Sequence, residues 1–123
     1  MATLLLSGYL RAKRLEKARV LLERLGEAIA CDLTAASVER YWRDPALFRF
    51  VATVDLGQLS FRDAYFEVPA RFASLSGRWS MTVPYSPTEG SSWDFEADTA
   101  RTSIAGVESV CFHVRADARP PDR

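Results

Sequence analysis

Carboxylates at alternate positions form the most distinctive polar cluster in the sequence. Asp94, Glu96 and Asp98 alternate with the apolar residues Trp93, Phe95 and Ala97. Because successive side chains of a β-strand point to opposite faces, the three acids would line one face of a sheet while the apolar residues enter the core. Neighbouring carboxylates on that face would lie about 6.5 to 7 Å apart. The sequence therefore predicts a row of three carboxylates, which we call the acidic strip.

Three roles are compatible with the acidic strip. A charged edge strand resists edge-to-edge aggregation, and this role needs no partner. A row of acids can also recognise a basic protein surface, where it speeds association and fixes the register of binding. A divalent cation would need further oxygen ligands from another element. The sequence offers no second carboxylate cluster, so we predict no metal site and leave the first two roles open.

The charge of the chain is balanced overall but unevenly distributed. Sixteen basic and sixteen acidic residues give a net charge of zero. The segment 85–109 nevertheless carries a net charge of −4, whereas residues 1–30 carry +3. Nucleic-acid binding usually requires a basic field, which this balance does not provide. We therefore expect a partner with a basic protein surface, and we expect neither nucleic acid nor membrane as a partner.

Few residues could perform nucleophilic or acid–base chemistry. His113 is the only histidine, and Cys111 two positions earlier would project parallel to it on a strand. We therefore expect His113 to form a local hydrogen bond rather than a catalytic pair with Cys111. Glu108 and Tyr65 are further acid–base candidates, but no pattern brings them together with His113. The glycines occur singly and no Gly-x-Ser-x-Gly motif is present, so the sequence predicts no enzyme and no cofactor.

Three aromatic residues differ from the others because they flank predicted turns beside charged residues. Tyrosine and tryptophan are enriched among the residues that dominate binding energy at interfaces. Half-buried residues at the rim of the core are the alternative interpretation for each of them. The predicted partner-binding set combines these aromatics with the acidic strip and one loop acid: Tyr41, Trp42, Tyr85, Glu89, Asp94, Glu96 and Asp98.

Hydrophobic periodicity predicts eight elements that would position these side chains. The predicted strands cover 3–11, 31–43, 48–56, 79–84, 93–97 and 107–115, and the predicted helices cover 14–30 and 61–75. Ser60 followed by Asp63 resembles a capping box at the start of the second helix. Pro69 either lies inside this helix and kinks it or begins the helix. We favour the kinked helix.

The order of these elements predicts an α+β fold. The first six match the β-α-β-β-α-β order of the ferredoxin-like arrangement, and the strands at 93–97 and 107–115 would be two additional C-terminal strands. Both helices would cover one face of a mainly antiparallel sheet. We expect a single domain over residues 1–116 and a flexible tail over 117–123.

Composition and the N-terminal segment indicate a cytoplasmic protein. No stretch is long and apolar enough for a secretory signal or a membrane span. Cys31 and Cys111 are too few for a disulfide framework and are expected to be buried free thiols.

Three segments resemble a known group of proteins. They are VERYWRDP at 38–45, GRWSMTVP at 77–84 and WDFE at 93–96. Together with the element order, they resemble small cytoplasmic immunity proteins of bacterial polymorphic-toxin and contact-dependent or type VI secretion systems. The resemblance implies an inhibitor that binds and neutralises a cognate toxin in the same cell. It carries no residue-by-residue assignment, because the toxin determines the binding residues.

Two other functions compete with this hypothesis. Ferredoxin-like domains often dimerise through their sheets and bind small metabolites, so a homodimeric sensing module is the alternative suggested by fold analogy. A small enzyme with a pocket at a dimer interface is the third possibility, and it would need two of the acid–base candidates within hydrogen-bond reach.

Overall fold

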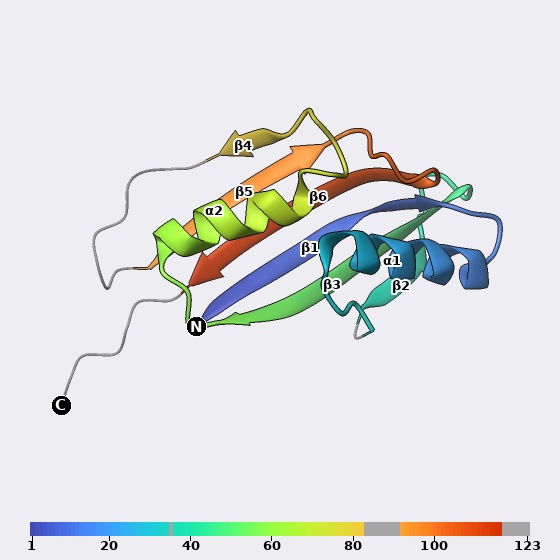
Figure 1. The fold of residues 1–123 in the computed structure, drawn as a ribbon. Coiled ribbons are helices and arrows are strands. Elements are labelled where there is room, and N and C mark those ends of the chain that lie inside the picture. Colours follow the sequence, from blue (N-terminus) through green and yellow to red (C-terminus); the bar gives the residue numbers. More distant parts are fainter. Residues whose placement is uncertain (35, 83–91, 117–123) are drawn as a thin grey trace.

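Two helices and six strands make up the described part of the chain. The computed structural model describes residues 1–34, 36–82 and 92–116 (Figure 1). In chain order the elements are β1 (Ala2–Arg11), α1 (Leu15–Ile29), β2 (Ser37–Arg40), β3 (Leu47–Gly57), α2 (Phe61–Phe72), β4 (Ser80–Thr82), β5 (Trp93–Thr99) and β6 (Val107–Ala116). The strands form one sheet in the order β2-β3-β1-β6-β5-β4. Every neighbouring pair is antiparallel.

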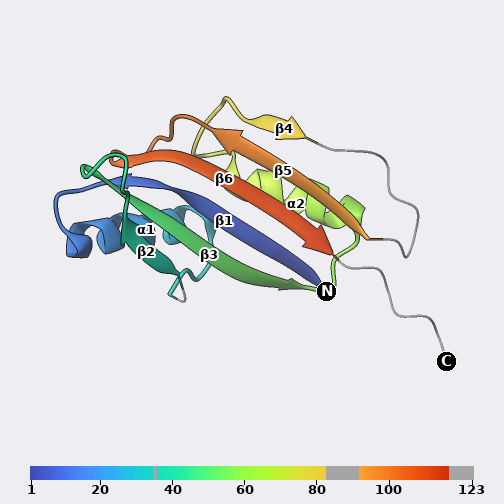
Figure 2. The same cartoon turned by 180° about the vertical axis from the view of Figure 1, so that it is seen from behind.

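Both helices lie on the same face of this sheet, which confirms the predicted α+β class. Helix α1 contacts β1 and β2, and α2 contacts β5. Seen from behind, the sheet lies in front of both helices, which remain partly visible beyond it (Figure 2). The two faces of the sheet therefore differ: one is covered by α1 and α2, and the other, which we call the helix-free face, is covered by neither.

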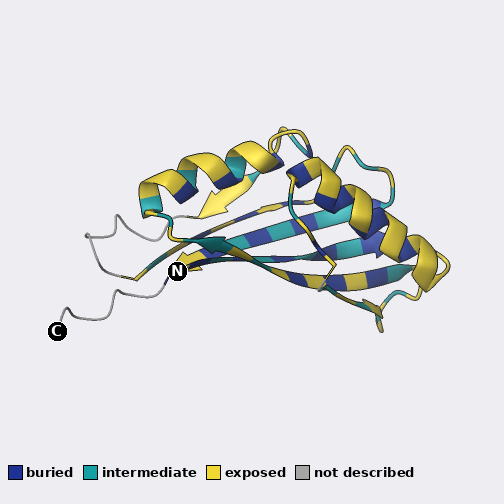
Figure 3. Ribbon diagram, turned by 60° about the horizontal axis from the view of Figure 1, so that its bottom comes forward, coloured by how far each residue is buried: buried dark blue, intermediate teal, exposed yellow. Residues whose placement is uncertain are grey.

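The core lies between the helices and the sheet. Along β1, Leu4, Leu6 and Leu10 are buried on the helix side, while Leu5, Ser7 and Tyr9 on the other side are only half-buried. Phe72 of α2 stacks on Phe112 of β6, with ring centroids 4.3 Å apart. The buried faces of helices and sheet meet along this layer in Figure 3. Period-two burial in the strands thus positions the alternate residues on the helix-free face.

The predicted position of the fourth strand is wrong. We expected the strand at 79–84 to complete the four-stranded arrangement and the two later strands to be appended to it. In the structure β6 pairs with β1, whereas β4 lies at the sheet edge and pairs only with β5. The physical reason is burial: β6 buries five residues (Val107, Val110, Phe112, Val114 and Ala116) along its length, whereas all three residues of β4 are exposed.

The second predicted strand is also shorter than expected. Strand β2 covers only Ser37–Arg40, not 31–43. Ala30 ends α1 in the left-handed conformation, and the N–H of Cys31 donates to the carbonyl oxygen of Gly26 at 2.9 Å. The carboxylate of Asp32 then accepts from the N–H of Thr34. The residues after α1 therefore satisfy its free carbonyl groups and form a turn instead of pairing in the sheet.

Helix α2 begins as predicted. The hydroxyl of Ser60 accepts a hydrogen bond from the N–H of Asp63 at 3.1 Å. Pro69 lies inside the helix, so the alternative in which the helix begins at Pro69 is wrong. The helix ends at Phe72 rather than near Leu75. Neither helix of the described residues combines the length and hydropathy needed to cross a lipid bilayer.

Gly8 lies beside a bulge where the central strands approach each other closely. The register between β1 and β6 shifts between Tyr9 and Leu10, so that Glu108 has no partner on β1. A Cβ atom on Gly8 would collide with the carbonyl oxygen of Ser109 and approach the ring of Phe50 to 2.8 Å. The close approach of these strands therefore requires glycine at this position.

Candidate functional site

The acidic strip lies on the helix-free face, as the sequence predicts. Asp94, Glu96 and Asp98 are exposed, whereas Phe95 and Ala97 between them are buried under the helices. This strict alternation fixes the orientation of β5, because a one-residue slip would bury all three carboxylates. The geometry of the strip is thus established, and its role in partner binding stays a prediction.

Strand β6 provides one neighbour for each acid. Asp94 lies opposite Arg115, Glu96 opposite His113, and Asp98 opposite Cys111. The His113 ring nitrogen Nε2 lies 2.9 Å from Oδ2 of Asp94. This confirms the predicted local hydrogen bond of His113. One acid of the strip is therefore tied to the sheet by a side-chain contact.

The other two acids have no such tie. On the opposite side, β4 places Ser80 next to Asp98 and Thr82 next to Glu96. Hydroxyl side chains are short and leave the longer acids accessible from the sheet edge. Within residues 1–34, 36–82 and 92–116, Glu96 and Asp98 form no ion pair. Both carboxylates are therefore available to an incoming cation.

An aromatic group occupies the other side of the same face. The Tyr41 ring lies 4.8 Å from that of Tyr9 and 6.2 Å from that of Trp42, measured between centroids. Trp42 is 80% exposed, and the Arg43 guanidinium carbon lies 4.7 Å from the centroid of its ring. Hydrogen bonding to Tyr41, followed by burial, raises the pKa of Tyr9. Tyr9, Tyr41 and Trp42 form what we call the aromatic group.

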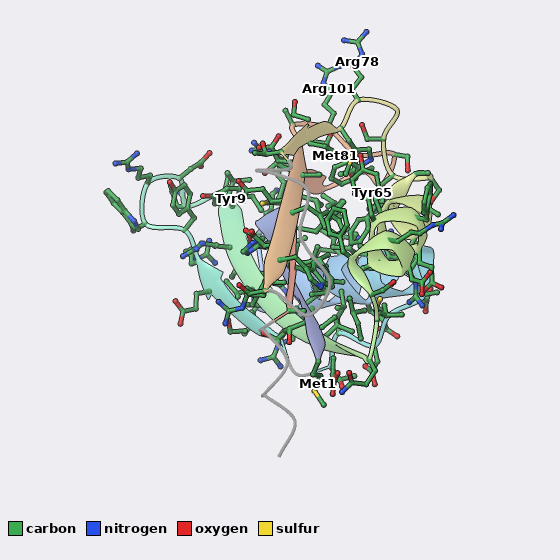
Figure 4. All side chains as sticks on the ribbon, turned by 90° about the vertical axis from the view of Figure 1, so that its left-hand side faces the viewer. Met1, Tyr9, Tyr65, Arg78, Met81 and Arg101 are labelled. Carbon is green, nitrogen blue, oxygen red and sulfur yellow. The ribbon has the colours of Figure 1, made fainter. Side chains whose placement is uncertain are left out.

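Tyr9 was not among the predicted site residues. Its position in β1, between the buried Gly8 and Leu10, was the available signal, because it places the ring opposite the core. Figure 4 views the sheet from one end and shows Tyr9 on the helix-free side and Tyr65 on the helix side.

A shallow depression of about 400 Å³ connects the aromatic group to the acidic strip. Its lining includes Tyr9, Arg49, Asp98 and Cys111. Sequence reasoning placed the acids and the aromatics in separate segments, and the sheet order brings both to one continuous surface. Tyr85 and Glu89, the other two predicted residues, lie outside the described residues.

The thiol on this surface is poorly suited to nucleophilic chemistry. Burial, followed by the negative charges of Glu96 and Asp98, raises the pKa of Cys111. The protonated thiol therefore dominates at neutral pH, whereas the thiolate is the nucleophile. Cys31 and Cys111 are both free, and both are half-buried rather than fully buried as expected. Among the described residues, no group of three or more His, Cys, Asp or Glu side chains could hold a metal ion.

No protein-family profile matches this chain, and no curated protein or solved structure does so either. The geometry and charge of the helix-free face are therefore the grounds for a functional proposal.

Proposed function

We propose that the protein binds a basic protein surface through its helix-free sheet face, and that this partner is a bacterial toxin which it neutralises. The observation that carries the proposal is the availability of Glu96 and Asp98, two exposed carboxylates without an ion-pair partner in the described part of the chain. Two adjacent like charges repel each other across a strand face. The positive charges of a basic partner would offset the repulsion between the two carboxylates. The same carboxylates would attract that partner toward this face before contact.

The aromatic group supports the same surface. A tryptophan that is 80% exposed contributes little to the core, and tryptophan is enriched among binding hot spots. Edge-to-face contact with Tyr41, which itself packs on Tyr9, restricts the position of Trp42 before any partner arrives. A restricted side chain loses less entropy on binding. Trp42 would therefore be the hydrophobic anchor, and the acidic strip would provide orientation.

The arrangement of strands suggests how this surface arose. We interpret β2-β3-β1-β6, together with the two helices, as a ferredoxin-like unit. In this interpretation β3 lies antiparallel between β1 and β2, and β6 takes the last position. The hairpin β4–β5 would then be an insertion between α2 and the final strand. The acidic strip would belong to that insertion and widen the helix-free face.

Neutralisation of a toxin is the form of binding that the sequence resemblance favours. Two of the resembling segments, 38–45 and 93–96, provide Trp42 and the start of the acidic strip. An inhibitor of this kind acts by occupying its target stoichiometrically, so it needs a binding surface and no catalytic group. The helix-free face meets this requirement.

A homodimeric sensing module is the second candidate. The depression beside Tyr9 and Asp98 favours it, because two sheets packed face to face would close that depression over a small ligand. This function predicts a dimer in the absence of any other protein. Light scattering after gel filtration distinguishes the two functions: the toxin-binding function predicts a monomer that forms a one-to-one complex.

The direct test of neutralisation is protection of growth. The tagged protein captures its partner from native cells, and the captured partner is then expressed in a heterologous host with or without this chain. The proposal predicts growth arrest by the partner alone and restored growth when the chain is co-expressed. Growth arrest that the chain does not relieve would contradict neutralisation even if the two proteins bind.

A further inference from the structure

A second surface feature lies where β1 leads into α1 and β2 leads into β3. A hollow of about 720 Å³ opens there, and its walls combine small apolar residues with basic side chains. The lining consists of Arg11, Ala12, Lys13, Lys17, Arg40, Pro45 and Ala46. No residue of β4, β5 or β6 takes part, so the hollow is separate from the acidic strip.

Arg40 is held in place at this hollow by three contacts. Its guanidinium carbon lies 4.6 Å from the centroid of the Phe48 ring. Nη1 donates to the carbonyl oxygen of Pro45 at 2.6 Å, and Nη2 donates to that of Lys13 at 3.2 Å. Both acceptors are neutral carbonyl groups, and Arg40 forms no ion pair with any of residues 1–34, 36–82 and 92–116.

The lysines of the hollow resemble Arg40 in this respect. Arg11 forms an ion pair with Glu108, which neutralises one of the four basic side chains. Lys13 and Lys17 form no ion pair with any residue of the described part. Three basic side chains without an ion-pair partner among the described residues therefore line one hollow, next to one carboxylate, that of Asp44, which accepts from the N–H of Ala46. An excess of basic over acidic side chains around a hollow favours a ligand that carries negative charge.

We propose that this hollow binds a small phosphorylated metabolite. Its phosphate groups would lie between Lys13, Lys17 and Arg40, and its organic part would contact Ala12, Pro45 and Ala46. Three cations match a ligand with more than one negative charge, and lysine binds phosphate as a mobile point charge. The hollow is also larger than one phosphate requires, which leaves room for an organic group. This site does not depend on the proposed function of the helix-free face.

A polyanion such as nucleic acid fits these observations less well. Nucleic-acid binding draws on many phosphate contacts along an extended basic surface. Here the basic side chains line a single hollow, and the exposed acids of β5 lie toward the other edge of the sheet. A compact ligand with clustered charge is therefore the better match.

Thermal unfolding and titration calorimetry test the site with defined probes: inorganic pyrophosphate, ATP, and uncharged adenosine. We expect pyrophosphate and ATP to raise the melting temperature, and adenosine alone to leave it unchanged. The variant Lys13→Gln/Lys17→Gln should bind ATP at least about tenfold more weakly, since each lost charge removes a charge-assisted contact. Without ligand, its melting temperature should be equal to or above that of the wild type, because two like charges are removed.

The matched control is Arg19→Gln/Arg24→Gln, which removes the same charge from exposed positions of α1 that do not line the hollow. This control should keep the response to ATP. Absence of stabilisation by millimolar pyrophosphate and ATP would overturn the proposal, as would equal ATP affinity in the lysine variant. Tighter binding of duplex DNA or RNA than of ATP, lost in the same lysine variant, would also overturn it in favour of a polyanion site.

Discussion

His113 and Asp94 are joined across β5 and β6, with 2.9 Å between Nε2 and Oδ2. This contact divides the acidic strip into two parts. Asp94 is engaged within the sheet, whereas Glu96 and Asp98 project from the same strand face without an ion-pair partner among the described residues. Stability and binding should therefore depend on different acids of one strand.

The first prediction follows from this division. Asp94→Asn should lower the free energy of unfolding by up to ~1 kcal/mol, because it weakens a partly exposed contact with His113. Glu96→Gln/Asp98→Asn should change it by less than ~0.5 kcal/mol or raise it slightly, because repulsion is relieved. Urea denaturation measures both values. A larger loss in the double variant than in Asp94→Asn would show that the strip is primarily structural.

Trp42→Ala should weaken partner binding without changing the stability of the fold. The side chain is 80% exposed, so its removal should leave the melting temperature unchanged. Loss of a binding hot spot costs ~2 kcal/mol or more, so affinity for the partner should fall about thirtyfold or more. Phe66→Ala, which removes another exposed aromatic from the helix side, is the matched control and should bind like the wild type. Equal affinity of the Trp42 and Phe66 variants would exclude the aromatic group from the interface.

Gly8→Ala should test the close approach of the central strands. The added methyl group would meet Ser109 and Phe50, so overpacking should lower the free energy of unfolding by ~1–3 kcal/mol. Gly77→Ala is the control, because nothing lies within 4 Å of a Cβ atom there. That control should unfold at the same or a slightly higher urea concentration. An unchanged Gly8 variant would mean that β1 and β6 can separate at the bulge at little cost.

The pH dependence of Cys111 alkylation should report the electrostatic environment that the acidic strip creates. Its raised pKa favours the protonated thiol in the folded state. The contribution of the protonated thiol to the free energy of unfolding is therefore fully present below the pKa of the thiol in the unfolded chain, about 8.5. It is lost as the pH rises through the pKa of the thiol in the folded protein. In a Cys31→Ser background, the rate of alkylation by iodoacetamide should show an apparent pKa above about 8.5.

Adding Glu96→Gln/Asp98→Asn to that background should lower the apparent pKa, because these two charges contribute to the shift. Burial is the larger cause, so part of the shift should persist. An apparent pKa at or below that of an unfolded thiol would contradict the environment described for Cys111.

The sequence predicted local structure better than spatial neighbours. Alternation in β1, β3, β5 and β6 identified the face of each residue, because burial on one side of a sheet imposes period two. It did not identify which strands pair. Strand β6 pairs with β1, and β4 is left at the edge, because β6 buries more residues than β4 does. A local sequence pattern describes one strand at a time, so it cannot show which of two strands will pair with the same neighbour.

For the candidate surfaces too, the sequence predicted residues within one strand but not contacts between distant segments. The acidic strip was predictable because its members belong to one strand. The contact between Tyr9 and Tyr41 joins two segments that are distant in the sequence, and so does the contact of Arg40 with the carbonyl of Lys13. Contacts of this kind depend on sheet order and loop geometry, so the aromatic group was only partly predicted and the basic hollow was not predicted at all.

The central claim is that the helix-free face binds a basic protein, and its most direct test is quantitative capture from native cells with matched charge variants. Wild type, Glu96→Lys/Asp98→Lys, and Glu23→Lys/Glu27→Lys on the exposed face of α1 are compared by mass spectrometry. We predict one basic partner at near-equal stoichiometry with the wild type and the α1 variant, and its loss with the strip variant. Equal recovery of that partner by all three proteins, or no enriched partner with any of them, would contradict the claim.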